Sequence, residues 1–362
     1  MVDIRVRRSS GERYRERQRI SARSKTAATR WGEQREHHLI ERGPTPKARE
    51  VPTLQTFAPR FLEGYAKANR HKPSGIAQKE IALRVHLAPL FGLKRLDSIT
   101  NEDVQRLKHQ MREKSAKTTN NVLTVLGKLL KVAVEWGVLE RMPCSIRLLK
   151  TPEGSMRFWD VAEYQRLVEA AQRQGSDVLV AVLLGGEAGL RAGEMRALEW
   201  TDIDFNARKL FVARSEWRGQ IGTTKGNRMR VVPMTTRLAD ALRRHRSLKG
   251  LRVLVDRNGQ PLSANALTYL IERATRSAGL ATTRKPKGAG PHVLRHTFCS
   301  HLAMKGAPAR SIQELAGHRD LTTTQRYMHL SPAAIDSAIR LLEVPTTDLA
   351  RGNREATAFA SS

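Results

Sequence analysis

The sequence predicts a protein of the α+β class that is mainly helical and carries small β-sheets. Apolar residues recur at helical spacing through residues 53–150 and again from 264 to 342. At the start of the chain, apolar and charged residues alternate as they do in a half-buried strand. Between residues 205 and 259, short strand-like runs are separated by turn residues. The 362 residues are enough for two or three domains.

Residues 1–42 predict a very small module of two strands and one helix. The alternation at positions 2–7 indicates the first strand, and a highly charged second strand follows a Ser-Ser-Gly turn. Ser21 or Ser24 is placed to cap a helix that carries Trp31 and Leu39. The alternative is a basic tail that becomes ordered only on binding.

A Gly-Pro-rich linker at 43–52 leads to a predicted four-helix domain over residues 53–150. The apolar residues of the first two faces are Leu54, Phe57, Phe61, Leu62 and Tyr65, and then Ile81, Val85, Leu87 and Leu90. Thr100 and Asp103 predict a capped third helix, and the apolar run 122–134 predicts a fourth that stops at Gly137. Lysines and arginines on the outer faces would make a basic bundle. A protein-binding helical domain with solvated charged faces is the alternative.

A mixed domain is predicted for residues 151–345, and a disordered tail rich in Thr, Ala and Ser for 346–362. The mixed domain contains, in order, a capped helix at 161–171, a buried helix at 178–184, strands at 205–213 and 228–233, a turn at 256–259, and helices from 264 to 342. Leu198 and Trp200 are expected to pack in its core.

The charge of the chain points to a polyanionic partner. Lys and Arg number 64 against 35 Asp and Glu, which gives a formal charge of +29. Self-repulsion of this size favours a nucleic-acid partner, so residues 1–42 are predicted to bind DNA. An anionic membrane is the rival partner, but no apolar run is long enough to span a bilayer. Charge alone leaves open whether the protein binds nucleic acid or acts on it.

The two cysteines, Cys144 and Cys299, form no close pair, so neither a disulfide framework nor a zinc ribbon is indicated. The first residues lack the apolar core of a signal peptide. We therefore expect a cytoplasmic, nucleoid-associated protein without membrane contact.

Four separated segments carry residue types that can take part in catalysis. They are residues 189–195, 224–233, 291–298 and 316–329. Their candidate catalytic side chains are Arg191, Lys225, His292, Arg295, His318 and Tyr327. Each has an ordinary reading when it is taken alone. Arg191 resembles half of a surface ion pair, Lys225 a hairpin tip, and Tyr327 a core aromatic with a satisfied hydroxyl. His296 and His301 are expected to be packing or hydrogen-bonded histidines, and His329 to cap a helix near Tyr327.

The order of the six candidates resembles that of the phage-integrase family of tyrosine recombinases, whose motif is Arg, Lys, His-x-x-Arg, His, Tyr. The flanking sequences match the family too. They are Gly-Leu-Arg-x-Gly-Glu, Thr-Lys-Gly in a segment that ends in Arg-Val-Val-Pro, His-x-Leu-Arg-His-Thr-Phe, and Gly-His with Thr-Thr before the tyrosine. The resemblance covers about residues 155–345. A weaker one identifies 53–150 with the family's helical core-binding domain and 1–42 with an arm-binding module, although two strands are evident where three are expected.

The chemistry of the set suits an attack on a phosphodiester. Arg191 and Arg295 can clamp the non-bridging oxygens and offset the charge that grows in the transition state. Tyr327 is the nucleophile, and His292 or His318 can accept its proton or bind a phosphoryl oxygen. Lys225 is suited to protonate the leaving 5′ oxygen, the role that the family assigns to it. The covalent link retains the ester energy, so rejoining needs no ATP.

Other chemistries fit less well. His292 and His296 have the spacing of a helical zinc pair, but no acidic residue lies between them and Arg295 would repel a dication. No phosphate-binding loop and no acidic cluster is evident, so we expect neither metal nor cofactor. Glu194 is expected to orient Arg191 or to pair with a histidine, and an ordinary i,i+3 surface pair is the alternative.

The resemblance implies a site-specific recombinase that integrates or excises a phage or mobile element. It implies a clamp around double-stranded DNA, a tetramer that joins two duplexes, and accessory DNA-bending or excision factors. An amphipathic face at 334–342 would dock on a neighbouring protomer. A type IB topoisomerase-like enzyme and a non-catalytic DNA-binding descendant are the alternatives.

Overall fold

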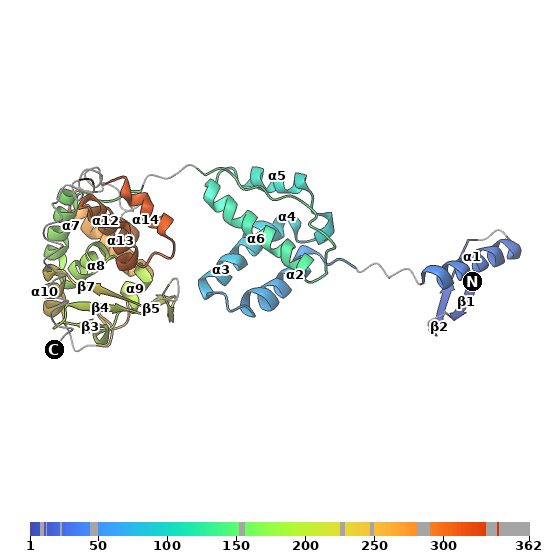
Figure 1. Ribbon diagram of the computed structural model, residues 1–362, viewed down its shortest axis with the longest axis horizontal. Helices are drawn as coiled ribbons and strands as arrows, with labels where there is room; N and C mark the ends of the chain where they lie inside the picture. The colour runs from blue at the N-terminus through green and yellow to red at the C-terminus, as the bar shows by residue number, and fades with distance from the viewer. Residues whose placement is uncertain are drawn as a thin grey trace, which may run out of the picture. The chain divides into compact units, whose positions relative to one another are not determined.

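The computed structural model describes residues 1–7, 11, 13–21, 24–43, 50–151, 156–224, 229–246, 250–280, 290–330 and 339. These residues are mostly helical and form three small antiparallel sheets, which confirms the predicted fold class (Figure 1). The chain divides into two compact units, 1–152 and 153–362. No helix among the described residues is long and apolar enough to cross a membrane.

The N-terminal residues form the two strands and the helix expected from the sequence. Strand β1 (Val2–Arg7) pairs antiparallel with β2 (Arg13–Gln18), and helix α1 (Lys25–Arg42) packs against β1. Ser24 caps α1 by accepting from the backbone N–H of Ala27. The alternation of apolar and charged residues sends Ile4 and Val6 inward, where they meet Leu39 in a small core.

Residues 53–150 contain the four predicted helical segments. The first segment is α2 (Leu54–Arg60), which continues into the π-helical η1 (Phe61–Lys67). The second consists of α3 (Pro73–Ile81), the π-helical η2 (Ala82–Leu87) and α4 (Ala88–Phe91). The third is α5 (Asn101–Gln110), preceded by the short 3₁₀ helix η3 (Leu96–Ser98), and the fourth is α6 (Ala116–Glu135). The predicted capping box of Thr100 and Asp103 is present at α5, and Gly137 has a φ of 64° just after α6.

The predicted buried face of the second segment is partly wrong. Leu87 is buried as expected, but Ile81 and Val85 are 46% and 48% exposed, and Ala82, Leu83 and Phe91 are buried instead. The reason is the π-helical turn η2, which holds more residues per turn than an α-helix. The buried stripe is therefore displaced around the helix relative to a 3.6-residue period.

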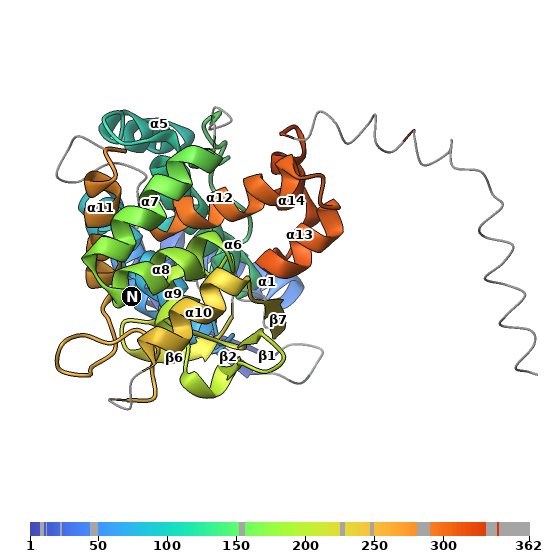
Figure 2. The same cartoon turned by 90° about the vertical axis from the view of Figure 1, so that its left-hand side faces the viewer.

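The second unit is built around helix α8 (Ser176–Gly186), whose residues are all buried from Val178 onward. Helices packed around it are α7 (Val161–Gln174), α10 (Thr236–His245), α11 (Ala264–Ser277) and α12 (Pro291–Met304). Figure 2 shows α7 and α10 alongside α8. The apolar run predicted for 178–184 is thus a central core helix, and the predicted cap of α7 is Asp160 with Glu163.

Small strands and short helices complete this unit. Strands β3 (Ile203–Asp204), β4 (Lys209–Val212) and β7 (Arg230–Pro233) form one sheet in that order, and β5 (Arg214–Trp217) and β6 (Gln220–Thr223) form a hairpin. The short helices are α9 (Ala192–Ala197), η4 (Trp200–Asp202), α13 (Ala309–Ala316) and α14 (Leu321–Met328). The strands predicted at 205–213 and 228–233 correspond to β4 and β7. The sequence does not predict the β5–β6 hairpin as such, because most of its residues are polar and all four residues of β6 are exposed.

Leu198 is buried and Trp200 packs half-buried against the same core, as expected. The predicted docking face at 334–342 and the tail at 346–362 lie outside the described residues, apart from Ile339, which is exposed.

Candidate active site

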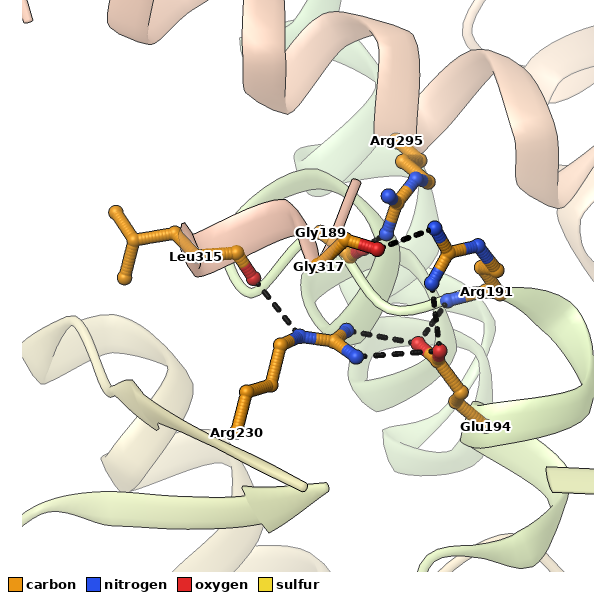
Figure 3. A network of polar contacts seen from close by, with 7 residues as sticks. All are labelled: Gly189, Arg191, Glu194, Arg230, Arg295, Leu315 and Gly317. Carbon is orange, nitrogen blue, oxygen red and sulfur yellow. Dashed lines mark hydrogen bonds and ion pairs between the residues drawn. The ribbon is translucent and has the colours of Figure 1, made fainter. Parts of the chain in front are cut away.

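Arg191 directly precedes α9 and is held by contacts on two sides. Its backbone N–H and Nη1 donate to the two oxygens of Glu194, at 2.9 and 2.8 Å. Its Nη2 donates to the carbonyl oxygen of Gly317, 126 residues further along the chain, at 2.8 Å (Figure 3). The guanidinium therefore joins the start of α9 to the end of α13.

Glu194 lies at the centre of this network and is almost fully buried. Arg230, the first residue of β7, donates to both of its oxygens, at 3.1 and 2.7 Å. Burial works to raise the pKa of the carboxyl, but the hydrogen bonds and charge of Arg230, with the charge of Arg191, outweigh it and hold the pKa at about 2. Glu194 is therefore a buried carboxylate shared by two arginines, and neither a surface pair nor a histidine partner describes it.

Arg295 on α12 is 5% exposed. Its Nη1 donates to the carbonyl oxygen of Gly189, whereas its Nη2 has no hydrogen-bond partner among the described residues. Burial, and then the charge of Arg191, lower the pKa of Arg295 to about 10, so it remains charged at neutral pH. A buried cation with an open donor is a site that favours an anion.

Tyr327 on α14 is 1% exposed and packs in a small cluster with α12 and α13 that includes Phe298 and Cys299. Its hydroxyl lies 2.7 Å from Nδ1 of His296. Burial and the neighbouring Cys299 thiol raise the pKa of the phenol, an effect only partly offset by Arg295. In this arrangement the phenol is protonated and shielded from solvent.

His318 follows α13 and its ring lies parallel to that of Tyr327, with the centroids 6.1 Å apart. Its Nδ1 is 2.9 Å from Oγ1 of Thr324. Burial, and then the charges of Arg295 and Arg191, lower the pKa of His318 to about 3. The imidazole beside the phenol is thus neutral at physiological pH.

His296 is a neighbour of Tyr327 that the sequence analysis did not place among the six catalytic candidates. It is hydrogen-bonded, as predicted, but its partner is the hydroxyl of Tyr327. Burial, and then the charges of His292 and Arg295, lower its pKa to about 4, so the ring is uncharged at neutral pH. Its place next to Arg295 and its four-residue spacing from His292 were the signals in the sequence, and neither pointed to Tyr327. His301 is also hydrogen-bonded, to the carbonyl oxygen of Trp159 at 2.9 Å.

The structure thus brings Arg191, Glu194 and Arg295 to one place and sets His318 beside Tyr327. His292 is exposed on the first turn of α12, one turn before His296, whose pKa it influences. Lys225 lies outside the described residues. His329 ends α14 and is exposed. Both cysteines are buried and free. Among the described residues, no group of His, Cys, Asp or Glu could hold a metal ion.

Two family models match the chain: "Phage integrase family" over residues 157–334 and "Phage integrase, N-terminal SAM-like domain" over 53–122. Tyrosine recombinase XerA of Thermococcus kodakarensis is 39% identical over 216 residues, which span 58% of this chain and 71% of the relative. Tyrosine recombinase XerC of Alcanivorax borkumensis is 28% identical over 294 residues, spanning 77% and 90%.

Solved structures share the fold at low sequence identity. The Tn1549 transposon integrase in complex with transposon right-end DNA has a TM-score of 0.69 at 21% identity, covering 81% of this chain and 100% of that one. A lambda integrase tetramer bound to a Holliday junction has a TM-score of 0.61 at 16% identity, covering 86% and 91%. The helical arrangement described above is therefore one that integrases also adopt.

Proposed function

The chain belongs to the phage integrase family of tyrosine recombinases, and from this premise we propose how its site cleaves and rejoins DNA. The enzyme is a site-specific DNA recombinase of the tyrosine type. The observation that carries the mechanism is Nη2 of Arg295, a buried donor near Arg191 that has no hydrogen-bond partner among the described residues. A non-bridging oxygen of the scissile phosphate is the acceptor that we assign to it.

In the proposed reaction, Arg191 and Arg295 bind the phosphate and stabilise the charge of the transition state. The Tyr327 oxygen forms a bond to phosphorus while the bond from phosphorus to the 5′ oxygen breaks. The phenol gives its proton to His318, which is neutral, or to His292, and Lys225 protonates the leaving 5′ oxygen. The product is a 3′-phosphotyrosine link, and the reverse attack by a 5′-hydroxyl rejoins the strand.

Tyr327 must change position before this step. The residue is 1% exposed and its hydroxyl is engaged with His296, so a DNA phosphate cannot reach it in this arrangement. We propose that DNA binding shifts α14 and brings the phenol to the phosphate held by the two arginines. Residues 328–330, which end the described part of α14 and its turn, are the connection that such a shift would use.

We also propose that residues 53–150 and the basic module 1–42 bind double-stranded DNA and that residues 151–345 form the catalytic domain. The formal charge of +29 supports this, because phosphate contacts would offset the self-repulsion. A tetramer on DNA is proposed by analogy with the lambda integrase tetramer on a Holliday junction. We further propose that the protein works in the cytoplasm at the nucleoid and integrates or excises a phage or mobile element. Accessory DNA-bending or excision factors would assist it.

The test of the nucleophile is a covalent adduct on half-site DNA. The parent protein is expected to form a denaturant-resistant protein–DNA adduct, and Tyr327→Phe to bind the same DNA without forming one. Tyr269→Phe is the matched control, since Tyr269 lies on α11 and is 55% exposed, and it should react normally. An adduct from the Tyr327→Phe variant would refute the assignment.

A type IB topoisomerase-like enzyme would use the same chemistry without a specific site. Relaxation of supercoiled DNA that lacks any attachment sequence would favour that alternative. A non-catalytic descendant would yield no adduct from the parent protein.

A further inference from the structure

Arg230 is a nearly buried arginine that the mechanism above does not use. It opens β7, five residues after Lys225, and its side chain is 9% exposed. Its guanidinium contacts two elements that are far apart in the sequence. Nη1 and Nη2 donate to the two oxygens of Glu194 on α9, and Nε donates to the carbonyl oxygen of Leu315 on α13 at 2.9 Å (Figure 3).

The acceptors of Arg230 are the same structures that hold Arg191. The Glu194 carboxylate accepts from both arginines, and the end of α13 supplies Leu315 to Arg230 and Gly317 to Arg191. A closed set of contacts results, in which each arginine joins α9 to α13. Because a guanidinium is a planar fork with several fixed donors, it can hold both partners in one geometry.

Gly317 shows how closely Arg230 is packed against this end of α13. A Cβ atom at Gly317 would lie 3.0 Å from Cδ and 3.1 Å from Nη1 of Arg230. Gly317 also has a φ of 64°, which ends α13 in the left-handed region. The next residue is His318, so the backbone that presents this histidine lies directly against the Arg230 side chain.

We infer that Arg230 is a positioning residue of the recombinase, which holds the Arg191 guanidinium and the His318 segment in the geometry that the reaction requires. This inference rests on the proposed function. Arg230 is largely buried and each of its three guanidinium nitrogens already donates to a protein group, so we assign it to positioning and not to contact with DNA. Without it, the Glu194 carboxylate keeps only Arg191 of the two arginines that donate to both of its oxygens, and the end of α13 loses its bond through Leu315.

The test compares DNA binding with single-turnover adduct formation in Arg230→Gln and Arg230→Lys. Binding of half-site DNA is expected to remain at the parental affinity, while the rate of adduct formation falls about 100-fold in Arg230→Gln, the usual effect of a misplaced catalytic group. Arg230→Lys restores a positive charge but not the planar fork, so only a minor part of the rate should return. An adduct rate equal to the parental one in Arg230→Gln would overturn the inference.

Arg196→Gln is the control for a merely structural loss. Arg196 lies on the same short helix α9 and forms a buried ion pair with Glu216, whose backbone oxygen it also contacts at 2.8 Å. These bonds lead to β5 and not to Arg191 or α13. Arg230→Gln and Arg196→Gln should both unfold at a lower temperature than the parent. Only Arg196→Gln should keep the parental rate of adduct formation per folded molecule, with the amount of folded protein measured by DNA binding. An equal loss of rate in both would overturn the inference.

A substrate with sulfur in place of the 5′ bridging oxygen tests whether Arg230→Gln is slow because Arg191 is misplaced or because Lys225 is. A thiolate is a good leaving group near neutral pH, so the need for a proton donor disappears. Lys225→Ala should be restored by this substrate, and Arg230→Gln should remain slow. Restoration of Arg230→Gln would show that its defect lies in leaving-group protonation, contrary to the inference. A parent protein inactive on both substrates would overturn the proposed function together with the inference, whereas an active parent isolates the inference.

Discussion

At the scale of single residues, burial sets the protonation state of the site before DNA arrives. The Glu194 carboxylate is ionised because two arginines outweigh the cost of its burial. His296 and His318 are neutral because burial and neighbouring cations lower the pKa of each imidazole together. Tyr327 is protonated because burial opposes the phenolate. The proposed nucleophile is therefore protonated, and the two histidines beside it are neutral and able to accept a proton.

These shifts predict a pH dependence of stability. The pKa of His296 is about 4 in the folded protein, against about 6.5 for an unfolded histidine, so the unfolded state binds more protons between these values. The neutral imidazole therefore contributes its full stabilisation of the fold above pH 6.5, and this stabilisation is lost as the pH falls from 6.5 through 4. His318, with a pKa of about 3, acts in the same direction.

Urea unfolding at a series of pH values measures this effect. The parent protein should lose stability steadily between pH 6.5 and 4, and His296→Gln should show a shallower loss, because glutamine does not titrate. His329→Gln, at an exposed histidine, should follow the parent curve. A His296→Gln curve parallel to that of the parent would contradict the assignment.

At the scale of elements, the ends of helices place the reactive groups. Arg191 stands where α9 begins, His318 just after α13 ends, and Tyr327 near the end of α14. A helix end changes the direction of the chain within one or two residues, so side chains from three short helices can meet at one point. The tight turn at Gly317 is what allows His318 to lie against the ring of Tyr327.

Gly317→Ala is expected to reduce both stability and cleavage. An alanine in the left-handed region costs about 1 kcal/mol, and here its Cβ would also press against Arg230. Gly306→Ala is the matched control, since Gly306 has a φ of 79° after α12 and its Cβ would meet no heavy atom of the described residues within 4 Å. It should carry the backbone cost alone, seen as a lower unfolding midpoint with parental adduct formation. Equal cleavage rates in the two variants would argue against close packing of Arg230 on the end of α13.

At the scale of the whole molecule, the formal charge of +29 dominates the behaviour expected with DNA. Each phosphate that a lysine or arginine neutralises releases counterions, so affinity falls with salt. The N-terminal sheet adds exposed arginines at positions 5 and 7. The chain should therefore bind DNA with an affinity governed by ionic strength.

Titration of full-length protein onto DNA between 50 and 200 mM salt should show a loss of about 10³-fold or more, as expected for six or more phosphate contacts. The double variant Arg5→Gln/Arg7→Gln should lower the slope of log affinity against log salt by about one to two if the N-terminal module contacts phosphates. An unchanged slope would argue against that role for residues 1–42.

Much of this fold could be predicted from local patterns. The alternation at Ile4 and Val6, the cap at Thr100 and the apolar run before Gly185 each depend on neighbours in the chain, and each was found in the structure. The prediction for the exposed Val85 was wrong because a π-helical turn changes the period that the prediction assumes. The polar β5–β6 hairpin has no apolar pattern by which to recognise it.

The order of the six reactive residue types along the chain was enough to identify the family, because that order does not depend on how the segments pack. Their partners could not be found in this way. The bond from Arg191 to Gly317 joins residues 126 positions apart, and those from Arg230 to Glu194 and Leu315 join three separate elements. These groups are distant in the sequence and meet only when the elements pack. Burial and charge then depend on that packing and not on the local sequence. For the same reason, the structure alone decided that Tyr327 lies shielded against His296.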